Sequence, residues 1–138
     1  MKYLAWSLVA LASYSIVSPL VSFVTRDVPS TVAALITNGI LAIAAFGVVL
    51  ASGESVAPYL THQKAPYMYL AGVFLAIGIL AYYRALSLGP VSIVVPIFGL
   101  FIVTSSAIGI AFLDEPLTAR KVAGIALALV AIYLTSVE

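Results

Sequence analysis

Long apolar runs separated by short polar breaks make up almost the whole chain. Five runs carry no formal charge, and they cover residues 3–25, 28–53, 65–83, 85–113 and 122–137. A helix that crosses about 30 Å of hydrocarbon needs roughly 20 mostly apolar residues. Each run approaches or exceeds that length, if the last one takes its first turn from residues 119–121. The pattern predicts an all-α, polytopic membrane protein with five transmembrane helices, at about 3–24, 30–51, 66–86, 91–113 and 119–137.

The polar breaks contain residues that begin and end helices. Pro29 and Ser30 suit the start of a second helix, with the serine as its cap. The stretch SGESVAPYLTHQKAP at 52–66 is the longest polar segment and predicts a surface loop. The glycine and proline of SLGP at 87–90 predict a tight antiparallel hairpin between the third and fourth helices. Thr118 is placed to cap the last helix.

Two other interpretations of the apolar runs fit less well. Strands of a membrane barrel alternate apolar and polar residues, whereas these runs are apolar on all sides. Lys2 and the apolar stretch through ALA at 10–12 loosely fit a signal peptide. The first run continues to Val24, however, and four more follow. We therefore expect it to remain as a membrane span.

Composition agrees with a membrane protein. The chain is 64% hydrophobic and 8% charged, with a mean hydropathy of +1.22, whereas soluble domains are about 45–50% apolar and about 25% charged. We expect one domain over residues 1–138. The net charge of +1 argues against nucleic acid as a partner. The lack of cysteine excludes disulfides and thiolate sites, and His62, the single histidine, excludes a histidine-rich metal site.

The basic residues are distributed unevenly between the two predicted faces of the membrane. Four lie on the face that holds the N-terminus: Lys2, Lys64, Arg120 and Lys121. Two lie on the other face: Arg26 and Arg84. The positive-inside rule places the first face in the cytoplasm. Because the excess is small, insertion of some copies in the opposite orientation stays open.

Polar residues inside the predicted spans are few, and none is Asp or Glu. Ionisable groups at depth usually mark an ion pathway, so this absence argues against a proton-coupled antiporter with a buried carboxylate. Tyr14, Ser15, Ser18 and Ser22 share one side of the first helix. They form either a pathway wall or a helix contact. Asn38 needs a partner on another helix or in a polar cavity.

Other residues in the second half of the chain have both a structural and a functional interpretation. Pro96, with Gly99 after it, predicts a kink or a local opening, which borders transport sites in many proteins but also occurs for packing alone. Arg84 lies near a helix end, where it can snorkel to the interface and stack on Tyr82 or Tyr83. Alternatively, it lines a vestibule and attracts anions.

The last predicted helix carries small residues on one stripe, at Gly124, Ala128, Ala131 and Thr135. Such a stripe lets two backbones approach closely, either within the chain or between two chains. No catalytic constellation, metal-ligand spacing or phosphate-binding glycine loop is present. Asp114 and Glu115 precede Pro116, where a cap or turn role fits better than chemistry. We expect neither an enzyme nor a cofactor.

From Tyr82 onward the chain resembles the EamA-type domain of the drug/metabolite transporter superfamily. The matching pieces are ALSLGP at 85–90, VVPIFGL at 94–100 and LDEPLTARKVAGIALALVAIYL at 113–134. The last piece is the most specific, with Glu115 and Gly124 in the family's positions. The first two predicted spans match only as hydrophobic helices.

The resemblance implies a mode of action. Most members contain two five-helix units in inverted orientation around a central cavity, and they move amino acids, nucleotide sugars, metabolites or drugs by alternating access. This chain looks like the short, single-unit branch, whose members would have to pair. Many single-unit relatives carry a polar or charged residue just after the fourth-helix proline. Phe98 and Gly99 stand there in this chain, which leaves an ion or substrate role for that segment in doubt.

Taken together, these features predict a small-metabolite transporter of the cell membrane that works as a homodimer, with antiparallel pairing as one option. Facilitated diffusion or exchange fits better than proton drive. We expect the substrate path between the first, third and fourth helices, with Tyr14, Ser18, Asn38, Tyr83, Arg84, Pro96 and Gly99 along it. A non-transporting structural subunit and a lipid-linked carrier flippase remain as alternatives.

Overall fold

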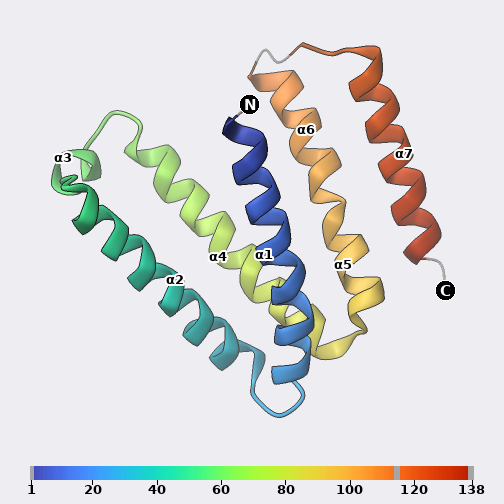
Figure 1. Ribbon diagram of the computed structural model, residues 1–138, viewed down its shortest axis with the longest axis horizontal. Helices are drawn as coiled ribbons and strands as arrows, with labels where there is room; N and C mark the ends of the chain where they lie inside the picture. Colours follow the sequence, from blue (N-terminus) through green and yellow to red (C-terminus); the bar gives the residue numbers. More distant parts are fainter. Residues whose placement is uncertain (1, 114–115, 137–138) are drawn as a thin grey trace. The chain divides into compact units, whose positions relative to one another are not determined.

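The computed structural model describes residues 2–113 and 116–136, which consist of helices and the turns that join them (Figure 1). No strand occurs among these residues, so the predicted all-α class is confirmed. The helices are α1 (Lys2–Val24), α2 (Ser30–Ser52), α3 (Ala57–Leu60), α4 (Ala65–Leu88), α5 (Val91–Gly99), α6 (Phe101–Phe112) and α7 (Ala119–Ser136).

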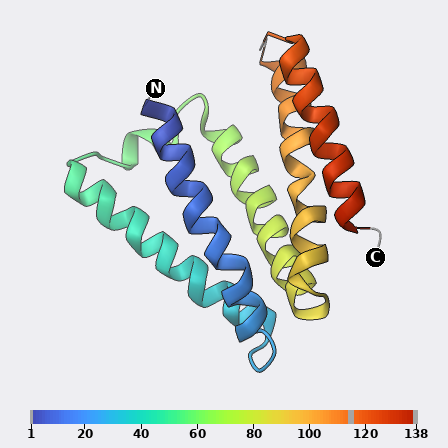
Figure 2. The same ribbon diagram turned by 45° about the vertical axis from the view of Figure 1, so that its right-hand side comes forward.

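The helices form two compact units, residues 1–88 and residues 89–138. In the first unit α4 packs against both α1 and α2, as two views show (Figures 1 and 2). α1 and α4 run in the same direction and α2 runs against them. In the second unit α7 packs antiparallel to α5 and α6. The expectation of one domain over the whole chain stays a prediction.

Both ends of α2 follow from local backbone chemistry. Pro29 is the residue before the helix, and its fixed φ of −53° directs the chain into the first turn. Ser30 is the first helical residue and makes no capping bond through its side chain, so its predicted role as the cap was wrong. Gly53 ends the helix with φ +71°, a conformation that costs other residues energy, and its N–H donates to Leu50 O at 3.3 Å.

The predicted surface loop at 52–66 contains a short helix, α3, that the sequence pattern did not reveal. Pro58 stands in its first turn, where a proline costs no hydrogen bond. α4 follows after a turn of four residues and begins at Ala65. The connection between α2 and α4 is therefore partly structured.

In the second unit the predicted span 91–113 is divided at Leu100 into α5 and α6. α5 continues through Pro96, and the interruption comes four residues later, next to Gly99. At this point Leu100 N–H donates to Ile97 O at 3.2 Å, one residue closer than in a regular α-helix. Thr118 Oγ1 accepts from Lys121 N–H at 3.3 Å, which confirms the predicted cap of α7. Asp114 and Glu115 lie outside the described residues.

Within the part of the chain that the structure describes, four candidate membrane spans are long and apolar enough to cross a bilayer: Tyr3–Val24, Ser30–Ser52, Ala65–Leu88 and Val91–Phe112, the last made of α5 and α6 together. The fifth predicted span is not confirmed. Its helix, α7, has 18 residues and begins with Ala119, Arg120 and Lys121. At 1.5 Å per residue it is about 27 Å long, and its two charges shorten the apolar part further.

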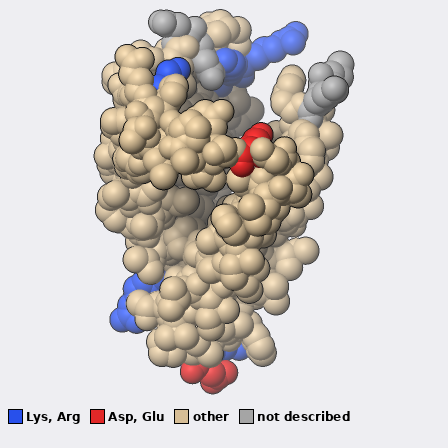
Figure 3. Space-filling model, turned by 90° about the vertical axis from the view of Figure 1, so that its left-hand side faces the viewer, with Lys and Arg blue, Asp and Glu red and all other residues tan. Residues whose placement is uncertain are grey.

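The surface of the first unit suits lipid better than water. Its buried apolar residues are mostly small or lie near one end of the unit: Val21, Ala33, Ala34, Ala65, Tyr83 and Leu86. Most large aliphatic side chains of α1, α2 and α4 are exposed. On the face drawn in Figure 3, charged groups lie toward the ends and the surface between them is uncharged. Hydrocarbon solvates such a surface without cost, whereas water does not.

Candidate functional site

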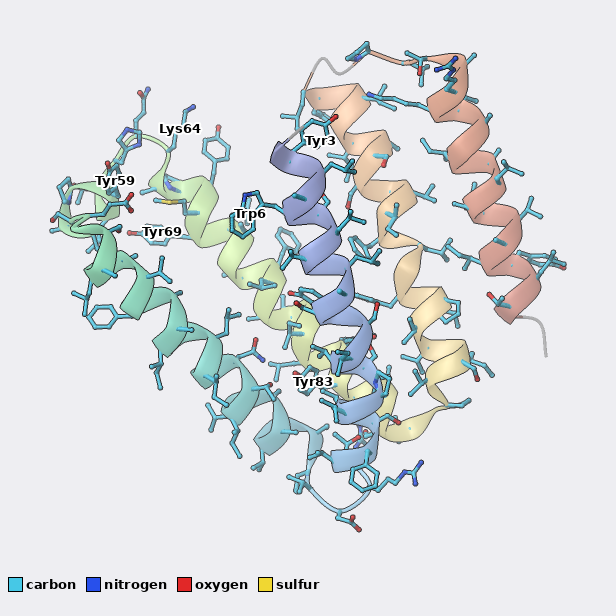
Figure 4. All side chains as sticks on the ribbon, in the orientation of Figure 1. Tyr3, Trp6, Tyr59, Lys64, Tyr69 and Tyr83 are labelled. Carbon is cyan, nitrogen blue, oxygen red and sulfur yellow. The ribbon has the colours of Figure 1, made fainter. Side chains whose placement is uncertain are left out.

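Two adjacent tyrosines on α4 hold the first unit together through their hydroxyl groups. Tyr82 Oη lies 2.7 Å from Ser18 Oγ on α1, and Tyr83 Oη lies 2.8 Å from Thr37 Oγ1 on α2. Successive residues of a helix point about 100° apart, so the two rings reach two different helices. Tyr83, labelled in Figure 4, is 4% exposed. These contacts are polar links of α4 to α1 and to α2.

The direction of the Tyr83 bond follows from the single proton on each hydroxyl. Thr37 Oγ1 also lies 2.9 Å from Ala33 O on its own helix, and a carbonyl can only accept. The threonine proton therefore goes to Ala33, and Tyr83 donates to Thr37. Both hydroxyl protons thereby have an acceptor within the unit.

Ser18 is 9% exposed and bonded to Tyr82. It is thus at a helix contact, which is one of the two roles that the sequence leaves open for the serine side of the first helix. Ser15, on the same predicted side, is exposed and donates to Leu11 O of its own helix at 2.7 Å. Tyr14 is 66% exposed. A shared pathway wall of Tyr14 and Ser18 stays a prediction.

A hollow of about 380 Å³ lies between α2 and α4, and Asn38 is its polar residue. Asn38 Nδ2 donates to Ala34 O at 2.8 Å, which uses one of the two amide protons. The rest of the lining is apolar and largely small: Ala34, Leu41, Ala42, Ala45, Gly72, Leu75, Ala76, Ile79 and Leu80. The hollow could accommodate an apolar group that carries one hydrogen-bonding function.

Arg84 is exposed, one turn before the end of α4, and its carbonyl accepts from Ser87 Oγ at 2.7 Å. Its neighbour Tyr83 points its hydroxyl at α2. Arg84 is not part of the hollow's lining. Its position permits the snorkelling role that the sequence predicts, and the vestibule role stays a prediction.

Gly99 lies where α5 faces α7. A methyl group built on it would meet Ile132 Cδ1 at 3.9 Å, which is an ordinary van der Waals contact. The site could therefore hold an alanine without displacing α7. Together with the helix break at Leu100, this makes the end of α5 a place of backbone irregularity rather than of tight packing.

The small-residue stripe of α7 is only partly used inside the second unit. Ala128 is half-buried, as are Ile125 and Ile132 on the same side of the helix. Gly124 and Ala131 are exposed, and a methyl group built on Gly124 would meet no atom within 4 Å. Within this unit, two of the predicted packing positions therefore remain available to another surface.

Thr37 and Tyr82 were not among the predicted site residues. The available signal was chemical, because a hydroxyl in an apolar span needs a partner. The sequence places two phenols in succession on α4 and a threonine beside Asn38, but it does not show which hydroxyls meet. Among the described residues, no three His, Asp or Glu side chains are grouped as metal ligands.

These observations define a class: a multi-pass α-helical membrane protein with a small polar network inside one helical unit. The model of the EamA-like transporter family matches residues 1–137. The chain belongs to this family, whose members are transporters rather than enzymes. The match also covers α1 and α2, which sequence inspection placed in the family only as hydrophobic helices. Comparisons with curated proteins and with solved structures gave no match.

Proposed function

We propose that the chain is a transporter of small metabolites in the cell membrane, working by alternating access as a dimer of five-helix units. The observation that supports transport is the membership of the chain in the EamA-like transporter family. The hollow at Asn38 supports a substrate contact on the α2–α4 side of the first unit. That position differs from the predicted path between the first, third and fourth helices, and we favour the hollow because Asn38, one of the predicted path residues, lines it.

The pairing of two copies is supported by the exposed part of α7. Gly124 and Ala131 allow a second helix to approach closely, and this close approach is what drives association in lipid. We propose a homodimer, with antiparallel insertion as an option that the weak charge bias leaves open. Orientation mapping with a reporter fused after Glu138 tests this, since a single orientation would exclude antiparallel pairs.

Uptake into liposomes that contain the purified chain tests transport directly. A panel of uncharged and zwitterionic metabolites is the first choice, because the hollow has no charged lining residue. Asn38→Leu should lower the initial rate by on the order of tenfold, the equivalent of one hydrogen bond worth about 1.4 kcal/mol. Ser13→Ala, which removes an exposed hydroxyl bonded within α1, is the matched control.

The absence of flux for every solute would instead favour a non-transporting subunit of a membrane complex. The flippase has less support, since the basic residues Arg26 and Arg84 are not among the residues that line the hollow between α2 and α4.

A further inference from the structure

The short connection between α2 and α4 exposes large apolar side chains outside the spans. We define the α3 segment as residues 56–64. Within it Val56, Tyr59 and Leu60 are each about half exposed. In water these three side chains add little to the stability of the connection, because they are about as exposed in the folded protein as in the unfolded chain. An apolar surface against the segment would bury them and lower the free energy of the folded state.

The α3 segment is held in a defined conformation. Tyr69 Oη on α4 donates to Leu60 O at 2.6 Å, across the turn between α3 and α4. Lys64 N–H donates to Nδ1 of His62 at 3.1 Å, and the ring of His62 lies 6.3 Å from that of Tyr59. These contacts fix the segment against the start of α4.

Five of the eight tyrosine and tryptophan residues of the first unit lie at the same end as this segment, whereas Tyr82 and Tyr83, toward the other end of α4, are bonded to α1 and α2. Tyr3 and Trp6 begin α1, Tyr59 lies on α3, and Tyr67 and Tyr69 begin α4. All five are exposed, and Figure 4 shows four of them with Lys64 at this end. Tyrosine and tryptophan prefer the interface between hydrocarbon and water, where the ring is in apolar surroundings and the polar group is hydrated. The turn at the opposite end of the unit, residues 25–29, contains neither residue.

We propose that the α3 segment lies in the phospholipid headgroup layer and anchors this end of the first unit. Val56, Tyr59 and Leu60 insert at the boundary with the acyl chains, while Lys64 extends its stem from that depth toward the phosphates. We take lipid, rather than another protein, to cover the α3 segment. The segment directly joins two candidate spans, α2 and α4, whose exposed sides are apolar enough to face hydrocarbon. The surface is thus continuous with the lipid-facing surface of the spans.

Tryptophan fluorescence tests the proposal, since Trp6 is the single tryptophan of the chain. The reporter variant is Trp6→Phe with Tyr59→Trp, in phosphatidylcholine vesicles whose lipids carry bromine at a shallow or a deep acyl position. Trp6→Phe with Phe74→Trp places a reporter in the middle of α4, and Trp6→Phe with Asp27→Trp places one in the opposite turn. Trp6→Phe with Leu60→Trp repeats the measurement if the first variant does not fold.

At residue 59 we expect quenching by the shallow bromolipid to exceed that by the deep one by roughly twofold, with weak quenching by aqueous acrylamide. Residue 74 should show the reverse order of the two lipids, and residue 27 should respond mainly to acrylamide. Strong acrylamide quenching at residues 59 and 60 would place the segment in water. Protection from all three quenchers would place protein over it, such as a second copy. Either result overturns the proposal and leaves the transport function untouched.

Discussion

The hydroxyl oxygens of Tyr83 and Thr37 lie 2.8 Å apart, joining α4 to α2 across 46 positions of sequence. The bond lies in a part of the unit where Tyr83 is almost fully buried and where few large apolar side chains are covered. Neighbouring helices gain little hydrophobic free energy from contact in lipid, so packing and hydrogen bonds must supply the specificity. The hydrogen bond between Tyr83 and Thr37 therefore helps to determine which face of α4 packs against α2.

A double-mutant cycle on Tyr83→Phe and Thr37→Val should measure that contribution. We expect each single change to lower the free energy of unfolding, with a coupling of roughly 0.6 kcal/mol, because interhelical hydrogen bonds in membranes have about that value. Unfolding in mixed micelles with increasing denaturing detergent provides the measurement. Tyr67→Phe, at an exposed position, is the control that should leave stability unchanged. Additive effects in the cycle would refute the coupling.

Replacing Ser18 by leucine should disrupt the contact between α1 and α4. Ser18 is buried against Tyr82, so three carbon atoms in place of the hydroxyl oxygen force the helices apart at a cost of about 1–3 kcal/mol. Ser15→Leu adds the same atoms at an exposed position of the same helix and should cost far less. Equal stability of the two variants would contradict the contact.

The Gly99→Ala change tests whether the irregular end of α5 flexes during transport. The added methyl group meets Ile132 at an ordinary distance, so stability should be kept or raised by roughly 0.5 kcal/mol. We expect slower uptake by liposomes, because the backbone loses freedom next to the break at Leu100. Gly78→Ala in α4, with open space at the methyl position, should stabilise without slowing uptake. An unchanged rate for Gly99→Ala would exclude the flexing role.

Removal of the Tyr69 hydroxyl should loosen the α3 segment without affecting the spans. In the background of Trp6→Phe and Tyr59→Trp, Tyr69→Phe deletes the donor to Leu60 O. We expect acrylamide quenching at residue 59 to rise while the helical circular dichroism stays the same. Tyr67→Phe serves as the control, two positions earlier on the same helix. Identical quenching in the two variants would show that the bond does not hold the segment.

Sequence reasoning placed the helix boundaries well where charge or turn chemistry marks them. α1, α2 and α4 begin and end within two residues of their predicted bounds. It missed α3, because four helical residues within a polar stretch leave no periodic pattern. It predicted a kink around Pro96, whereas the interruption lies at Leu100. A proline removes one backbone hydrogen bond of the helix, but the packing of the surrounding side chains determines where the helix is interrupted.

The sequence by itself determined the solvent of this protein, since uncharged runs of this length are stable only in lipid. It also determined the order and bounds of α1, α2 and α4, whereas the division of the next run into α5 and α6 was revealed only by the structure, and the fifth predicted span is not confirmed. The partners of the polar side chains were decided by the tertiary structure alone. Ser18 could have lined a pathway, and its bond to Tyr82 places it at a helix contact. Asn38 could have bonded another helix, and it lines a hollow instead. Hydropathy is a property of each residue, whereas a hydrogen bond across 46 or 64 positions depends on how the helices are rotated and packed, which no local pattern specifies.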